Sequence, residues 1–514
     1  MRSLSTLLFT LLCLPQMLRA QGAGDVLFDT DQVIEIRMTF PDDDFWVELS
    51  MNHNAGEELS IPVGMEITDM SGTYALDSVG VRLKGNSSYD FYPTSKKPMK
   101  LDFNEFIGGQ NFHGLKKLNL NNCWSDPTFM REKIFFDMSR EQGVLAPRMN
   151  YANVYLNDMF WGFYALVEQV DKTFLDRWLG ENDGNLFKAG DNYTLDGAGL
   201  GQEADLNHYG NTAANYAGRY ELKTNETQND WSDLIQLLDL IDNSSFNDLV
   251  TELPQAMVLD EALRSLALDN IFGNMDAYYG SARNYYLYHD SSTFQWNWIK
   301  WDANMSFGRY VPQWIDDPAT LPATYTASGR RLLQRVMQNA TLRTAYLNEY
   351  CAVLDRFSNA ELDPRIDALR SLVEEHVEAD NNKEFSSGIF ALGIDQTVTT
   401  QSGQNWHTIP GLKSFIAQRR DHLLSSSLNC TTAGVEEFAV VDLAVFPNPT
   451  AGLLQLTLPS GVRDSDVSVS DAMGRAVPVL VQFGRMDLGA LPAGSYVVGA
   501  LTSELDARVL VVKE

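Results

Sequence analysis

The first half of the chain consists of short runs of alternating hydrophobic and polar residues, separated by turn residues. Between about Asp25 and Tyr89 these runs include VIEIRMTF, GMEITDM and VGVRLKG, and their period of two is typical of half-buried β-strands. Residues 126–143 instead carry apolar residues at helical spacing and end in a glycine, which predicts a helix. Strands are predicted again over residues 150–158 and 159–170. The pattern therefore predicts a strand-rich lobe.

The second half carries apolar residues at every third or fourth position, which predicts helices. The predicted helical segments are 231–242, 259–273, 330–357 and 364–382. A strand-rich lobe followed by a helix-rich lobe indicates an α+β fold. A short polar linker, residues 429–437, then leads to strand-like runs over residues 438–514, which predict a small all-β sandwich.

Within the helix-rich half, residues 285–302 are typical of two strands joined by a turn at Asp290–Ser292. A hairpin brings its ends together, so we expect Asp276 and Asn284, before or at its start, to lie near Asp302 at its end. Carboxylate and amide oxygens suit Mg²⁺, which takes its other ligands from phosphate and water. An acid, an amide and a second acid in this order are the groups that phosphoryl transfer needs. The alternative is structural, with Asp276 capping a turn and Asp302 bonded to backbone amides.

A predicted strand and turn upstream supply positive charge and small polar residues. The stretch GVRLKGNSS places a glycine and hydroxyl groups where the backbone could approach a phosphate. The next strand offers Lys96, Lys97 and Lys100. The candidate phosphate-binding residues of the turn and its approach are Arg82, Gly85, Asn86, Ser87 and Ser88. The alternative is a solvated edge strand that its lysines protect from pairing.

Charge and targeting signals narrow the class of protein. Against 39 Lys and Arg, 68 Asp and Glu residues give a net charge of −29, which disfavours nucleic acid and anionic membrane surfaces as partners. Residues 1–20 have one arginine before a short apolar run and end in small residues, as a secretory signal peptide does. Since no later stretch has about 20 uninterrupted apolar residues, we expect a secreted or cell-surface protein without a transmembrane segment.

Cysteines and other common motifs add little chemistry. Cys123, Cys351 and Cys430 remain after the predicted signal peptide and match no zinc-binding spacing. In an oxidising compartment we expect Cys351 to pair with Cys430. The sequence has no Gly-x-Ser-x-Gly or His-Glu-x-x-His motif, which disfavours hydrolases of those classes. The stretches FPDDDFW and LDGAGLG are candidate calcium sites without the ligand spacing of an EF-hand.

Nine motifs spread over most of the chain carry a family resemblance. In order they are VGVRLKGNSSYDF, KKPMKLDFNEF, MREKIFFDMSREQGVLAPR, GFYALVEQVDKTFL, GNLFKA, YELKTNE, NMDAYY, RNYYLY and WDANMSFG. From about residue 27 to 425 the chain resembles the CotH kinase family, atypical secreted kinases named for a spore coat protein. This resemblance implies a two-lobed kinase-like domain over residues 25–428. It also implies a protein that uses ATP with Mg²⁺ or Mn²⁺ to phosphorylate Ser or Thr of another exported protein, and we expect this protein to be a monomer.

The resemblance implies roles for individual residues. Asp276, in Asn-x-Asp, corresponds to the catalytic acid, and Asn284 and Asp302 correspond to the magnesium ligands. Lys97 or Lys100 takes the phosphate-binding role, and Lys97 is preferred because it stands at the family's Lys-Lys-x-x-Lys position.

Further positions follow from the same resemblance. Leu166–Leu175 corresponds to the hinge, with backbone groups near adenine, and Glu168 within it is a candidate nucleotide-binding residue whose side chain we expect to be structural. Family members often have a histidine before the metal-binding asparagine, where this chain has Arg283. The acid that pairs with the nucleotide lysine is left open among three helix residues, Glu132, Asp137 and Glu141.

The C-terminal region carries a second resemblance. VFPNPTAG, LPAGSYVV and the terminal RVLVVKE resemble the type A sorting domain of the type IX secretion system of Bacteroidetes, over residues 438–514. This implies an export address recognised by the type IX secretion machinery. One alternative is an ordinary carbohydrate-binding or adhesive sandwich. For the whole chain, the alternative is a kinase-fold surface protein that binds or adheres without turnover.

Overall fold

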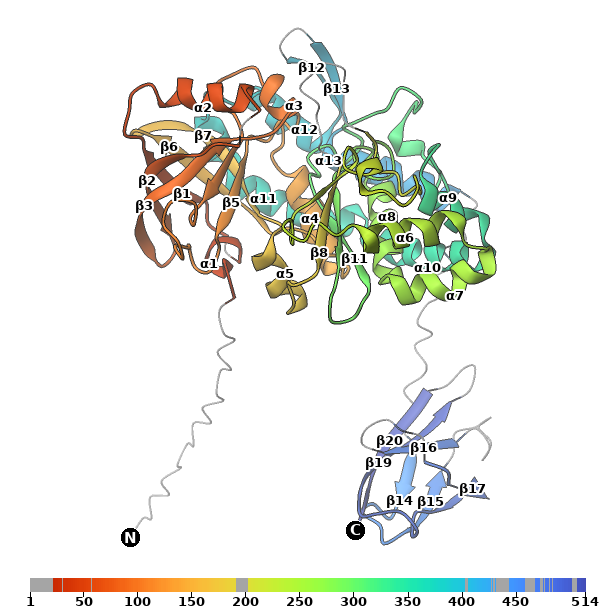
Figure 1. Cartoon of the computed structure of the whole chain (residues 1–514). Helices are drawn as coiled ribbons and strands as arrows, with labels where there is room; N and C mark the ends of the chain where they lie inside the picture. Colours follow the sequence, from red (N-terminus) through yellow and green to blue (C-terminus); the bar gives the residue numbers. More distant parts are fainter. Residues whose placement is uncertain are drawn as a thin grey trace, which may run out of the picture. The chain divides into compact units, whose positions relative to one another are not determined.

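The chain divides into two compact units, Met1–Leu428 and Asn429–Glu514. The computed structural model (Figure 1) describes residues 22–29, 31–56, 58–190, 202–402, 405–426, 428, 430, 443–457, 467–471, 475, 477–479, 481–482, 484–501 and 506–514. The predicted signal peptide, most of the predicted linker and the LDGAGLG stretch lie outside these residues. Within them, no helix has the length and apolar character needed to cross a membrane.

The strand-rich part of the first unit is a closed barrel with the strand order β1-β2-β3-β4-β5-β7-β6. Its strands are β1 (Ile34–Thr39), β2 (Ile61–Asp69), β3 (Gly72–Leu83), β4 (Met99–Asp102), β5 (Lys117–Asn121), β6 (Met149–Leu156) and β7 (Met159–Glu168). Alternate residues point into the barrel, as in β1 with Ile34, Ile36 and Met38 buried. The parallel pairing of β1 with β6 closes the barrel, and strand periodicity did not predict this closure.

Some helices accompany the barrel and the others belong to the rest of the unit (Figure 1). The former are α1 (Asp25–Phe28), α2 (Phe45–Asn54) and α3 (Ser87–Asp90). The latter are α4 (Arg131–Glu141), α5 (Lys172–Leu179), α6 (Ser232–Asn243), α7 (Phe246–Ala256), α8 (Leu259–Ile271), α9 (Arg331–Gln338), α10 (Ala340–Arg356), α11 (Asn359–Ala379), α12 (Ser387–Asp395) and α13 (Leu412–Ser425). The predicted segment 330–357 divides at Asn339, whose side chain accepts a hydrogen bond from the Leu342 N–H and caps α10. The predicted α+β class is confirmed.

A four-stranded sheet with the order β11-β10-β8-β9 is embedded among these helices. Its strands are β8 (Asn185–Ala189), β9 (Tyr220–Leu222), β10 (Tyr285–His289) and β11 (Trp296–Lys300). The predicted hairpin is confirmed, because β10 pairs antiparallel with β11 and places Tyr285 opposite Lys300. Its turn reaches Gln295, beyond the predicted Ser292, and the Asp290 carboxylate accepts hydrogen bonds from backbone N–H groups inside it.

The end of α11 is fastened to the barrel by a buried ion pair. Lys96 Nζ lies 2.7 Å from Asp380 Oδ2, and neither side chain is exposed to solvent. The same carboxylate accepts hydrogen bonds from the backbone N–H groups of Phe163 and Asn382. Lys96, a candidate phosphate lysine in the sequence, is therefore part of the core and unavailable to a ligand.

The second unit contains two antiparallel sheets that share one apolar core. One sheet consists of β14 (Ala444–Phe446), β15 (Leu453–Thr457), β18 (Arg485–Asp487) and β17 (Val481–Gln482), and the other of β16 (Val467–Asp471), β19 (Gly494–Leu501) and β20 (Asp506–Lys513). The turn motif and the terminal motif of this unit meet, since Asn448 exchanges side-chain hydrogen bonds with the backbone of Leu510 and Val512.

The cysteines match the sequence prediction. Cys351 and Cys430 are disulfide-bonded, whereas Cys123 is a buried free thiol.

A two-stranded hairpin, β12 (Val398–Ser402) with β13 (Asn405–Ile409), completes the first unit.

Candidate active site

The ends of the β10–β11 hairpin bring the three predicted site residues together. Asn284 Nδ2 donates hydrogen bonds to the Asp276 carbonyl at 2.6 Å and to Asp276 Oδ2 at 3.2 Å. Asn284 and Asp302 both have a left-handed backbone, with φ of 60° and 52°, which turns the chain sharply where each leaves the hairpin. The charge of Asp302 raises the pKa of Asp276, so the two carboxylates are close enough to repel each other electrostatically.

The loop that carries Asp276 is anchored to the hairpin by a second buried ion pair. Asp269, near the end of α8, lies 2.6 Å from Lys300 Nζ at the end of β11. The other oxygen of Asp269 accepts a hydrogen bond from Asn274 Nδ2 at 3.1 Å. Because Asn274 is two residues before Asp276, these contacts hold the start of the loop against the strand that leads to Asp302.

Two carboxylates, Asp276 and Glu132, feel the negative charge of Asp302. Burial and the charge of Asp302 raise the pKa of Asp276 to about 7. The same two causes raise the pKa of Glu132, at the start of α4, to about 8. Burial and a nearby negative charge both make a carboxyl group resist ionisation. The crowding therefore fits a site that binds a cation next to Asp302.

Of the three acids left open by the sequence, Glu132 is the one that faces the site. Its Oε1 accepts a hydrogen bond from the N–H of Ala303, directly after Asp302, at 3.2 Å. Asp137 instead binds Lys133 and Arg140 on its own helix, and Glu141 binds Arg365. Glu132 therefore fixes the turn that presents Asp302.

Two buried or half-buried lysines of the barrel lie near each other, and one of them interacts with this cluster. Lys84 Nζ donates a hydrogen bond to Asn119 Oδ1 at 3.0 Å. Burial lowers its pKa to about 8 against the opposing charges of Asp302 and Glu132. Lys100 lies opposite Asn119 on the neighbouring strand, and burial lowers its pKa to about 7.

The charges that act most strongly on Lys100 are all positive. They come from Arg82, Lys117, Lys84 and Lys223, and all lower its pKa further. Lys188, on β8, acts on Lys84 in the same sense. A half-buried group of cations in a protein with a charge of −29 fits an anion of several charges, such as a triphosphate. No sequence pattern distinguished Lys84, which stands inside the strand pattern VGVRLKG, or Lys188 as a site residue, although both lie within the family motifs.

The preferred lysine of the sequence, Lys97, lies apart from this group. Its Nζ donates hydrogen bonds to the carbonyls of Tyr89 at 2.6 Å and Tyr92 at 3.0 Å. Its pKa is lowered by burial, and the carboxylate that acts on it is Asp90 rather than Asp302. The structure thus joins Lys84, and not Lys97, to the acidic cluster, and Lys100 is close enough to Lys84 for their charges to interact.

The predicted phosphate turn is compact and begins beside Lys84. Gly85 has φ of +87°, and a Cβ there would lie 2.4 Å from Ser88 Oγ, so this tight turn requires glycine. Asn86 precedes α3, which starts at Ser87, and the Ser88 carbonyl accepts a hydrogen bond from Asn122.

The remaining two candidates are engaged in ion pairs. Arg82 binds Glu58 at 2.7 Å on the surface, while its charge still acts on Lys100. Glu168 is buried and binds Arg148 Nη2 at 2.5 Å and Nε at 3.1 Å. Its side chain therefore fixes the end of β7, which agrees with the structural role expected from the sequence.

The acidic cluster suits a metal ion that takes most of its ligands from phosphate and water. Among the described residues, no group of three or more His, Cys, Asp and Glu is placed to hold a metal ion. The FPDDDFW stretch is thereby not supported as a calcium site. Asp302 and Asn284 offer only part of an octahedral shell, and phosphate oxygens and water complete such a shell for Mg²⁺.

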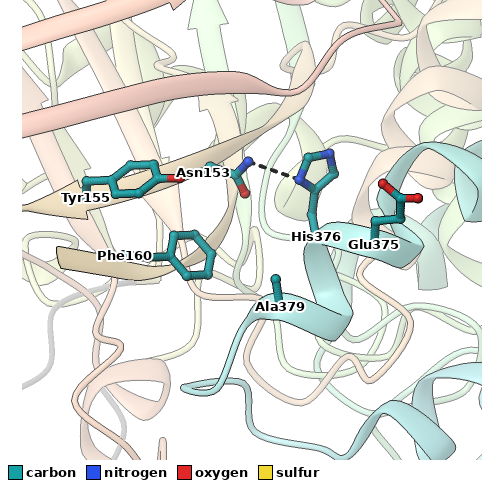
Figure 2. Close-up of a pocket in the computed structure, with 6 residues that line it drawn as sticks. All are labelled: Asn153, Tyr155, Phe160, Glu375, His376 and Ala379. Atoms are coloured by element: carbon teal, nitrogen blue, oxygen red, sulfur yellow. Dashed lines mark hydrogen bonds between the residues drawn. The ribbon is translucent and has the colours of Figure 1, made fainter. Parts of the chain in front are cut away.

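A pocket elsewhere in the unit contains none of the predicted residues. It has a volume of about 290 Å³ and is lined by Asn153, Tyr155, Phe160, Glu375, His376 and Ala379. Figure 2 shows β6 and β7 on one side and α11 on the other, joined by the hydrogen bond between Asn153 Nδ2 and His376 Nδ1 at 3.0 Å. Burial lowers the pKa of His376, consistent with a neutral ring that accepts this bond.

Because the pKa of Asp276 is raised, replacing this carboxylate with a neutral amide should change the stability of the protein by an amount that depends on pH. The folded protein binds a proton at Asp276 up to about pH 7, whereas an unfolded carboxyl releases it near pH 4. The folded state thus binds more protons in this range, and its unfolding free energy falls as pH rises. We expect Asp276→Asn to raise the unfolding temperature by about 2 °C or more at pH 8, relative to its effect at pH 4.5.

The measurement is thermal unfolding at both pH values without metal or nucleotide. Asp260→Asn, at an exposed carboxylate on α8, serves as the matched control. An Asp276→Asn effect that is the same at both pH values contradicts the crowding described above.

Comparisons with known proteins agree with these motifs. The family model described as CotH kinase protein matches residues 81–423, well over half of the chain. The inner spore coat protein H of Bacillus subtilis (strain 168) is 29% identical over 236 residues, which are 45% of this chain and 60% of that protein. The matched segment thus spans less than two thirds of that relative.

Two solved structures are also similar to this chain. The HipA–HipB–operator DNA complex of Shewanella oneidensis MR-1 matches with a TM-score of 0.31 and 12% identity over 66% of this chain and 68% of that chain. The proinflammatory kinase CtkA of Helicobacter pylori matches with a TM-score of 0.26 and 10% identity, over 64% and 91%. At such TM-scores neither carries an argument, and it is the match to the family model that shows that the chain belongs to the CotH kinase protein family.

Proposed function

We propose that this protein transfers the γ-phosphate of ATP, with Mg²⁺ or Mn²⁺, to a Ser or Thr hydroxyl of another exported protein. The observation that carries the proposal is an acidic cluster next to a basic group. Burial and the charge of Asp302 raise the pKa values of Asp276 and Glu132, and burial and neighbouring cations lower the pKa of Lys100. A divalent metal with a triphosphate would place positive charge beside the carboxylates and negative charge beside the lysines.

Asp302 and Asn284 are the residues that would hold the metal, whose positive charge stabilises the phosphate oxygens during transfer. Asp276 would orient the acceptor hydroxyl and accept its proton, since burial and the charge of Asp302 raise its pKa to about 7. Glu132 would keep the Asp302 turn in place through the Ala303 N–H.

Lys100 and Lys84 would bind the phosphates in place of Lys97. The charges of Asp302 and Glu132 act on Lys84, whereas the carboxylate that acts on Lys97 is Asp90. Lys100 extends the same basic surface along β4, beside Arg82 on β3.

The assignment of the lysines predicts a difference between two neighbours. Lys100→Met is expected to raise the KM for ATP about tenfold, because it removes a charge-assisted contact with phosphate. Lys97→Met is expected to change this KM less than about twofold, since its ammonium binds backbone carbonyls. Initial rates at varied ATP concentration measure both values. A larger effect for Lys97→Met reverses the assignment.

Export is proposed from the sequence motifs alone. The signal-like residues 1–20 and the sorting-like residues 438–514 support a secreted or surface protein that the type IX machinery exports. Its acceptor would then be another exported protein, and the acidic surface argues against nucleic acid as a partner.

The first experiment is incubation of the purified chain with labelled ATP and either Mg²⁺ or Mn²⁺. Label on the chain itself or on a general acceptor protein, dependent on metal, supports the kinase function. A folded protein that neither incorporates label nor binds nucleotide with metal contradicts it and favours the binding or adhesion alternative.

A further inference from the structure

Arg283 lies beside the candidate catalytic acid and belongs to the same loop. It stands between Asp276 and β10, directly before Asn284. The loop packs closely against the end of β8, since a Cβ on Gly190 would lie 2.4 Å from the Arg283 Cβ. Ala282 and Asn284, on either side, both have positive φ. The course of this backbone therefore fixes where the Arg283 side chain leaves the loop.

The guanidinium of Arg283 has unused hydrogen-bonding capacity. Its one hydrogen bond within the described part of the chain runs from Nε to the Ser281 carbonyl at 3.4 Å, and it forms no ion pair there. Neighbouring arginines differ: Arg330 binds Glu203, and Arg331 binds Asp242. A half-buried guanidinium with free Nη groups is suited to a bidentate contact with a carboxylate or a phosphate.

The charge of Arg283 acts on the acceptor side of the site. It acts to lower the pKa of Asp276. It also acts to lower the pKa of Tyr310, which the charge of Asp276 acts to raise. The charges that act most strongly on Lys84 and Lys100 come from other residues. The charge of Asp302 acts on both Lys84 and Asp276, whereas that of Arg283 acts on Asp276. A hydroxyl that Asp276 orients would therefore lie within reach of the Arg283 charge.

We infer that Arg283 is a specificity residue that binds an anionic group, a carboxylate or a phosphate, next to the acceptor hydroxyl of a peptide substrate. This inference rests on the proposed function. In the reaction the hydroxyl oxygen bonds to the γ-phosphorus, the bond to the oxygen bridging to the β-phosphate breaks, and ADP leaves. The hydroxyl proton passes to the Asp276 carboxylate. Arg283 holds the acceptor and exchanges no proton or bond.

The test compares peptides that contain a single acceptor serine. The flanking positions carry alanine, aspartate, lysine or phosphoserine, and the full chain is assayed with ATP and Mg²⁺. We expect kcat/KM for the aspartate or phosphoserine peptide to exceed that of the alanine peptide by about tenfold, and the lysine peptide to be the poorest. The relative rates of the aspartate and phosphoserine peptides identify which anion is bound.

Variants then assign the preference to Arg283. In Arg283→Gln the ratio of anionic to alanine peptide is expected to fall to about one through a higher KM for the anionic peptide, and Arg283→Lys should retain part of it. Arg370→Gln, on the surface of α11, is the matched control, and the KM for ATP and the unfolding temperature report on folding and nucleotide binding. Equal use of all peptides by the wild type, or a ratio that persists in Arg283→Gln, overturns the inference while the kinase function stands. A lack of label on every peptide and on the chain itself rejects the proposed function together with it.

Discussion

Asp302→Asn is expected to lower kcat/KM by about 10³-fold or more and to weaken metal-dependent binding of ATP. Asp302 is the shared centre of the site, because its charge acts on Asp276, Glu132 and Lys84. An amide keeps the shape of the side chain but supplies no negative charge for a divalent cation. Binding and turnover should therefore be lost together.

Asp276→Asn is expected to separate metal-dependent ATP binding from turnover. It should lower kcat by about 10²- to 10⁴-fold, because the acceptor proton loses its base, while the metal ligands Asn284 and Asp302 remain. Binding of Mg²⁺ and ATP should be retained or strengthened, since one of the repelling carboxylates is gone. The Asn284 amide keeps its hydrogen bond to the Asp276 carbonyl, which preserves the loop.

Two measurements distinguish these variants. Calorimetric titration with ATP at fixed Mg²⁺ gives the affinity, and incorporation of labelled phosphate gives turnover. Asp367→Asn, which removes an exposed partner of Lys413, is the control. An Asp276→Asn protein with wild-type turnover, or an Asp302→Asn protein with wild-type metal-dependent affinity, contradicts the assigned roles.

Asp380→Asn is expected to destabilise the first unit by about 3–5 kcal/mol, because it leaves the ammonium of Lys96 buried without its counter-ion. Both side chains are fully buried, and Asp380 also accepts backbone hydrogen bonds from β7 and from the residues after α11. The loss should therefore loosen the attachment of α11 to the barrel.

The stability prediction is tested by denaturant unfolding followed by tryptophan fluorescence. Lys96→Met combined with Asp380→Leu should recover much of the loss, since an apolar pair leaves no buried charge. Glu374→Gln, which breaks the exposed pair with Arg370, should cost about 1 kcal/mol or less. A loss below about 1 kcal/mol in Asp380→Asn would show that Lys96 escapes to solvent.

The hairpin and its ligands could be predicted because their determinants are local. Alternation over residues 285–300 and the turn-forming Asp290 specify the pairing of β10 with β11. Once that pairing exists, the positions flanking it must meet. Asn284 and Asp302 could therefore be assigned to one site before any other contact was known.

The roles of the basic residues could not be predicted in the same way. Lys96, Lys97 and Lys100 lie within five positions, but one is buried against Asp380, one binds carbonyls of its own loop, and one lies among other cations. No local pattern distinguishes these environments. Asp380 is 284 positions from Lys96 in the chain, and the barrel that orients β4 closes through the pairing of β1 with β6.

Glu132 shows the same dependence on distant contacts. The sequence left the acid open among Glu132, Asp137 and Glu141, but the Ala303 N–H, 171 positions away, singles out Glu132. Backbone turns and strand pairing in a hairpin depend on neighbours a few residues apart, and these a sequence displays directly. Burial, charge and hydrogen-bond partners depend on every group within a few ångströms in space. Those neighbours exist only once the barrel, α4 and the hairpin have packed together.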